Sequence, residues 1–142
     1  DECPYLMESV VFDGGSGLVS TAEDYMKFAQ MLLNNGKAGN TRVLGRKSIE
    51  LLSSNHLSEA ITSQKQYPRG KGFGITVGVT LDPGLAGEYG SKGNFYWGGA
   101  ASTTFWIDPK EELIAILMTQ LLGNHHPFLS QFRVLTYQSI TD

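Results

Sequence analysis

A run of six apolar residues from Leu113 to Met118 limits the possible folds of this chain more than any other feature. The run has no polar residues at alternate positions, so a strand formed by it must be covered on both faces. It is also far too short to cross a bilayer. These properties predict a sheet with helices on both sides, in an α/β fold of the α+β type.

The neighbouring residues predict the other strands of an antiparallel sheet. Apolar residues alternate with small ones over 73–81, which indicates one strand with a single core face. A second strand is expected from about Asn94 to Gly99. Residues 103–107 and 113–119 then form an antiparallel hairpin, because a turn that contains proline separates them.

Helical patterns lie on either side of the strand-forming region. Ser20 and Glu23 have the spacing of a capping box, and they precede apolar residues at helical spacing over 22–33. A shorter helix is expected over 46–53, after a glycine turn. A third helix, over about 127–141, begins at a proline and places its apolar side against the sheet.

Composition excludes several classes of partner. The 142 residues carry a formal net charge of −3 and no run of basic residues, so a nucleic-acid partner is not expected. The single cysteine, Cys3, permits no internal disulfide. No membrane span and no signal peptide are expected within the chain, and its compartment, cytoplasmic or periplasmic, stays open.

The segment Trp97-Gly98-Gly99-Ala100 is the first candidate for a functional site. Two adjacent glycines in a strand remove side chains at a place where another group approaches the backbone. That group is either a bound substrate, or a neighbouring element that packs tightly or forms a bulge. The sequence of this segment alone leaves both interpretations open.

Other active-site patterns are missing. Ser16 does not form a nucleophile elbow, because Leu18 occupies the position of the last glycine. His125-His126 are sequence neighbours and lack the spacing of a zinc pair on a helix, so no metal and no cofactor is expected. The pair Glu111-Glu112 falls in a turn, where a solvated charged pair is the expected interpretation.

Three segments in this order give the chain a family resemblance: Gly14 to Tyr25, Trp97 to Ala100, and Phe105 to Pro109. The chain resembles the C-terminal part of the serine β-lactamase and D,D-peptidase superfamily. Within it, the class C β-lactamase-like branch with the family VIII carboxylesterases is most similar. Such enzymes carry Ser-x-x-Lys, Tyr-x-Asn and a third motif on a strand. In the esterases the third motif often reads Trp-Gly-Gly, as at residues 97–99.

The resemblance implies a role for each residue of the third motif. The backbone amide of Ala100 would be one donor of an oxyanion hole, and Trp97, Gly98 and Gly99 would bind a small-molecule ester or β-lactam substrate. Trp97 stands where β-lactamases and peptidases carry a polar residue, which favours a neutral ester. No Ser-x-x-Lys or Tyr-x-Asn occurs in the 142 residues, so the nucleophile is expected outside them.

Residues 1–142 are therefore expected to be a single C-terminal fragment of a larger domain. It has a helical segment at about 20–54, a sheet at about 73–120 and a C-terminal helix at about 127–141. The fragment alone is expected to be inactive, with apolar edges that the N-terminal part of the protein or self-association covers. Two alternatives stay open: a non-catalytic penicillin-binding-like module, and an unrelated structural domain.

Overall fold

The computed structural model describes residues 15, 18–122 and 127–141 of the chain. The described helices are α1 (Ala22–Leu33), α2 (Arg46–Leu52), α3 (Glu59–Thr62), α4 (Pro83–Ala86) and α5 (Phe128–Gln138). The described strands are β1 (Lys37–Ala38), β2 (Thr41–Arg42), β3 (Lys71–Phe73), β4 (Gly78–Thr80), β5 (Phe95–Gly98), β6 (Thr104–Asp108) and β7 (Leu113–Leu117). Cys3, Ser16 and the pair His125-His126 lie outside the described residues.

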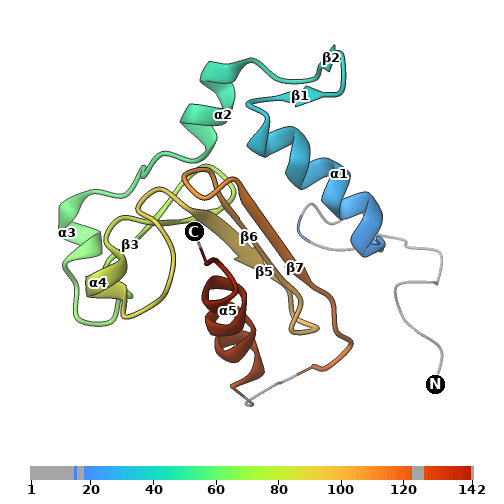
Figure 1. Cartoon of the computed structure of the whole chain (residues 1–142). Helices are drawn as coiled ribbons and strands as arrows, with labels where there is room; N and C mark the ends of the chain where they lie inside the picture. Colours follow the sequence, from blue (N-terminus) through green and yellow to red (C-terminus); the bar gives the residue numbers. More distant parts are fainter. Residues whose placement is uncertain (1–14, 16–17, 123–126, 142) are drawn as a thin grey trace, which may run out of the picture.

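The main sheet has five strands in the order β3-β4-β5-β6-β7, and every neighbouring pair is antiparallel. Strands β1 and β2 form a separate small hairpin after α1. The expected hairpin of residues 103–107 and 113–119 is confirmed as β6 and β7, with Phe105 opposite Ile116. The chain is thus an antiparallel sheet flanked by helices, as the sequence predicts (Figure 1).

Alternate residues of β6 contact helices on opposite faces of the sheet. The ring of Phe105 lies 5.0 Å from that of Tyr25 on α1, and the ring of Trp106 lies 5.2 Å from that of Phe132 on α5. Successive side chains of a strand point to opposite faces, so α1 and α5 cover different sides of the sheet (Figure 1). The prediction of helices on both sides is confirmed.

The single strand expected over 73–81 is wrong, because the chain turns back within it. β3 ends at Phe73, which pairs with Gly78 at the start of β4. Residues 74–77 form the connection, closed by a hydrogen bond from the Gly74 N–H to the Val77 carbonyl at 2.7 Å. A Cβ on Gly74 would lie 2.0 Å from the Leu52 carbonyl oxygen, so the end of α2 packs directly against this turn.

The helix expected over 22–33 is confirmed, but its cap differs from the expected one. The Thr21 hydroxyl, not that of Ser20, accepts a hydrogen bond from the Asp24 N–H at 3.2 Å. Thr21 has extended backbone dihedrals, which an N-cap requires, and it stands three residues before an acidic residue just as Ser20 does. Spacing alone therefore could not separate the two hydroxyls.

β7 lies at one edge of the sheet and pairs with β6 alone among the described strands. Its sequence carries no charge and no proline, which are common protections of an edge. Exposed apolar side chains continue beyond the strand at Met118, Leu121 and Leu122. Within the described residues, no helix has the length and apolar character needed to cross a membrane.

Candidate active site

The segment singled out by the sequence lies at the end of β5 and in the turn that follows it. Trp97 is 49% exposed, and Gly98, Gly99 and Ala100 are also exposed. The backbone of this segment is thus open to approach. A closed core around these residues, which would have contradicted the interpretation as a binding site, is not what the structure shows.

The turn between β5 and β6 is a three-residue loop of a common hairpin class. The Gly99 N–H donates to the Thr103 carbonyl at 2.9 Å, and the Ser102 N–H donates to the Gly99 carbonyl at 3.0 Å. Ser102 has a φ of 59°, in the left-handed region. This pattern matches a type I turn followed by one left-handed residue, with Ala100 and Ala101 at its two central positions.

The geometry of this turn directs the Ala100 N–H outward. The Gly99 carbonyl and the Ala100 N–H belong to one trans peptide and point in opposite directions. Because the Gly99 carbonyl accepts its bond from Ser102 inside the turn, the Ala100 N–H points away from the turn. Among the described residues, no hydrogen bond of this N–H is found. It is available to an external acceptor.

The close approach that the two glycines permit is made by the hairpin itself. A Cβ on Gly99 would lie 2.5 Å from the Thr103 Oγ1, and a Cβ on Gly98 would lie 3.1 Å from the Thr103 carbonyl oxygen. The tight-packing interpretation thus accounts for Gly99. The glycine pair is no sign of a ligand by itself, and the exposed amide of Ala100 is the stronger feature.

Trp97 gives the segment an apolar wall. Its ring and that of Phe73 meet edge to face, with the ring centroids 5.3 Å apart and the planes at 82°. Two hydrogen bonds fix the backbone of Phe73, one from its N–H to Asn55 Oδ1 at 3.1 Å and one to its carbonyl from the His56 N–H at 2.8 Å. Phe73 was not predicted as part of the site, because an aromatic residue in a strand pattern ordinarily indicates core.

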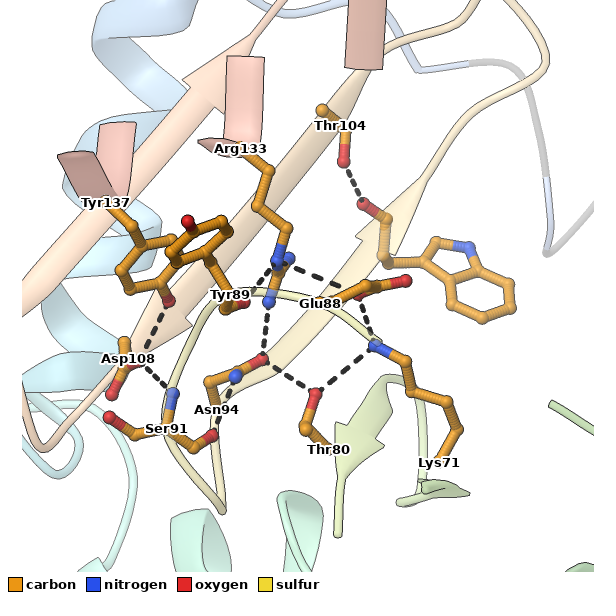
Figure 2. Close-up of polar contacts among 11 residues, drawn as sticks. Lys71, Thr80, Glu88, Tyr89, Ser91, Asn94, Thr104, Asp108, Arg133 and Tyr137 are labelled. Carbon is orange, nitrogen blue, oxygen red and sulfur yellow. Dashed lines mark hydrogen bonds and ion pairs between the residues drawn. The ribbon is translucent and has the colours of Figure 1, made fainter. Parts of the chain in front are cut away.

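A polar network holds the start of β5 (Figure 2). The buried Lys71 ammonium contacts Glu88 at 2.6 Å and Thr80 at 3.4 Å. Thr80 donates to Asn94 Oδ1 at 3.1 Å, and the same oxygen accepts from Arg133 on α5 at 3.1 Å. Asn94 is fully buried and directly precedes β5. The network therefore ties the site strand to β3, β4 and α5.

Tyr96 lies over this network beside Trp97. The Lys71 ammonium sits 4.6 Å from the centroid of its ring, within the range of a cation–π contact. Burial, followed by the nearby charge of Glu88, raises the pKa of Tyr96 to about 12. This raised pKa keeps the Tyr96 phenol protonated at neutral pH.

The described part of the site supplies a donor and an apolar surface but no nucleophile. Two hydroxyls near the turn act as hydrogen-bond donors, Ser102 to the Leu121 carbonyl at 2.7 Å and Thr119 to the Ala101 carbonyl at 2.5 Å. Within the described ranges, no group of three His, Cys, Asp or Glu side chains could hold a metal ion. What the arrangement can do is stabilise negative charge on an oxygen placed at the Ala100 N–H.

Comparisons with known proteins cover most of this chain. The family model described as Beta-lactamase matches residues 2–137. Two curated relatives from Mycobacterium tuberculosis, Protein Rv1367c (strain H37Rv) and Uncharacterized protein MT1414 (strain CDC 1551), are each 33% identical over 137 residues. Each alignment covers 89% of this chain and 32% of the relative. The chain thus spans about a third of the length of the curated relatives it matches.

Solved structures show the same fold. The structure titled "EstCE1, a hydrolase with promiscuous acyltransferase activity" has a TM-score of 0.74 at 26% identity, over 87% of this chain and 31% of that one. Simvastatin synthase (LovD) from Aspergillus terreus has a TM-score of 0.66 at 22% identity, over 83% of this chain and 33% of that one. The family model, the relatives and the fold agree, and this chain belongs to the Beta-lactamase family.

Proposed function

We propose that this chain forms one wall of the active site of a serine hydrolase that works through an acyl-enzyme. The nucleophile would lie in polypeptide outside residues 1–142, in an N-terminal part of the same domain. The observation that carries the proposal is the exposed Ala100 N–H, directed outward by the turn and without a partner among the described residues. Family membership and the structural likeness to EstCE1, a hydrolase with promiscuous acyltransferase activity, support it.

In the proposed reaction, a serine oxygen attacks the carbonyl carbon of the substrate and forms a tetrahedral intermediate. The negative oxygen of that intermediate would accept a hydrogen bond from the Ala100 N–H. The leaving alcohol takes a proton as the acyl-enzyme forms, and water then releases the carboxylic acid. The contribution of this chain is to hold a donor ready before the charge develops.

We propose a neutral carboxylic ester, rather than a β-lactam, as the substrate. The side chain next to the two glycines is Trp97, half exposed and in contact with Phe73, so it offers a substrate an aromatic surface and no charge. A β-lactam carboxylate would gain no ion pair from this residue. β5 pairs with β4 only as far as Tyr96, so the acyl group would extend along the exposed backbone of residues 97–99.

We further propose that the free edge of β7 is covered by the N-terminal part of the protein or by a second copy. Unpaired strand edges readily pair with other strands, and this one is apolar throughout. The 32% coverage of the curated relatives supports the first of these two occupants.

A fluorophosphonate probe, an activated short-chain ester and a chromogenic cephalosporin test the proposal. Applied to the complete protein, the probe should label a serine outside residues 1–142, and the ester should be hydrolysed faster than the cephalosporin. The 142-residue chain alone should remain unlabelled. Labelling of the 142-residue chain would contradict the assignment of the nucleophile, and an unreactive complete protein would favour a non-catalytic binding module.

A further inference from the structure

We propose that Thr119 is a positioning residue that aims and polarises the Ala100 N–H through two peptide planes. Thr119 follows β7, and its hydroxyl donates to the turn after β5. The inference rests on the proposed function, since it names the residue that orients the proposed oxyanion donor. Thr119 links the end of β7 to the turn after β5.

The first link joins Thr119 to the turn. Its Oγ1 donates to the Ala101 carbonyl at 2.5 Å, and the Leu121 N–H donates to the same oxygen at 3.2 Å. The Ala101 carbonyl and the Ser102 N–H share one peptide plane. The hydroxyl of Thr119 therefore orients the Ser102 N–H, which points in the opposite direction within that plane.

The second link runs inside the turn. The Ser102 N–H donates to the Gly99 carbonyl at 3.0 Å, and that carbonyl shares its peptide plane with the Ala100 N–H. Each hydrogen bond in such a chain polarises the next, so a donor at Thr119 strengthens the last N–H as well as directing it. The relay ends at the N–H that has no partner among the described residues.

The turn requires such support because Ser102 adopts a conformation that is unfavourable for a side chain. Its φ of 59° lies in the left-handed region, where glycine is the usual residue of this turn class. The Ser102 hydroxyl compensates by donating to the Leu121 carbonyl at 2.7 Å. Three hydrogen bonds thus fasten the turn to residues 119–121.

The test compares Thr119→Val, which keeps the shape and removes the hydroxyl, with Thr119→Ser, which keeps the hydroxyl. In the complete protein, Thr119→Val should lower kcat for an activated ester about 10- to 100-fold with little change in KM, because the lost contact acts on the transition state. Thr119→Ser should restore kcat to within a few-fold of the unaltered protein. Thr136→Val is the matched control, since its hydroxyl also donates to a carbonyl, at 2.8 Å within α5.

A second readout does not depend on catalysis. In the complete protein, the backbone order parameter of the Ala100 N–H, measured by nitrogen-15 relaxation, should fall in Thr119→Val and recover in Thr119→Ser. An unchanged order parameter with unchanged kcat would overturn the inference, as would a loss of thermal stability without a loss of kcat. If the complete protein hydrolyses no ester, the proposed function fails, and the order parameter alone still decides whether Thr119 holds the Ala100 amide.

Discussion

Replacing Ala100 with proline removes the one N–H on which the proposed chemistry depends and leaves the turn able to form. Ala100 occupies the first central position of the turn, where proline is favoured because the proline ring holds φ at about −60°. The φ of Ala100 is not in the left-handed region. No hydrogen bond of the Ala100 N–H is found among the described residues, so proline breaks no contact of the fold there.

The expected effects on activity and on stability have opposite signs. An oxyanion donor is worth about 2.7–4 kcal/mol of the activation barrier, so kcat of the complete protein should fall roughly 10²- to 10³-fold. The free energy of unfolding should stay constant or rise by about 0.4–1 kcal/mol, because proline restricts the unfolded chain. A simple folding defect cannot produce this combination.

The assay measures ester hydrolysis and urea unfolding, both on the complete protein. Ala100→Gly is the control, since it retains the N–H and should retain kcat to within a few-fold. An Ala100→Pro protein with unchanged kcat and unchanged stability would refute the assignment of Ala100 as an oxyanion donor. A large loss of stability would instead show that the turn differs from the one described.

Three further predictions test the packing around the site. Gly99→Ala should destabilise the chain by about 1–3 kcal/mol, because its Cβ meets Thr103 Oγ1 at 2.5 Å, and adding Thr103→Ala should recover most of that loss in urea unfolding. Glu88→Gln should lower the free energy of unfolding by about 1–3 kcal/mol, because it leaves the buried Lys71 ammonium without its carboxylate. Lys71→Met should lower it less, because the Glu88 side chain is 44% exposed and stays hydrated without its partner. The reverse order in denaturant titrations would contradict this. The pKa of Tyr96 is raised from 10.0 to about 12, so the folded state keeps the phenol proton at pH values where the unfolded state has lost it. The free energy of unfolding should therefore fall as the pH rises from 10.0 to about 12. The same decline in a Tyr96→Phe chain would show that Tyr96 does not cause it.

The sequence predicted the main sheet and its helices because their signals are local. The apolar run at 113–118 identified the strand β7, and helical spacing identified α1 with its observed bounds. The prediction of one strand over 73–81 was wrong because residues on both sides of a tight turn keep the alternation of apolar and small residues that is typical of a strand. The contact between Gly74 and Leu52 that fixes this turn joins residues far apart in sequence, so no local pattern could indicate it.

At the candidate site, too, some features could be predicted from the sequence and others could not. Trp97 to Ala100 could be found from the sequence, since glycine pairs in strands are unusual, and the segment is indeed exposed. The sequence could not show why residue 99 is a glycine, because the reason is the position of the Thr103 side chain in the folded hairpin. Thr119 could not be found either, since its role arises only when the end of β7 lies against the turn after β5.

The central claim is that the Ala100 N–H binds the developing oxyanion of a substrate. The most direct measurement is a crystal structure of the complete protein labelled with a fluorophosphonate, whose tetrahedral phosphorus imitates the intermediate. We expect one phosphonyl oxygen at about 2.7–3.1 Å from the Ala100 nitrogen, with the labelled serine outside residues 1–142. A labelled protein in which that oxygen accepts from other donors and the Ala100 N–H faces solvent would contradict the account.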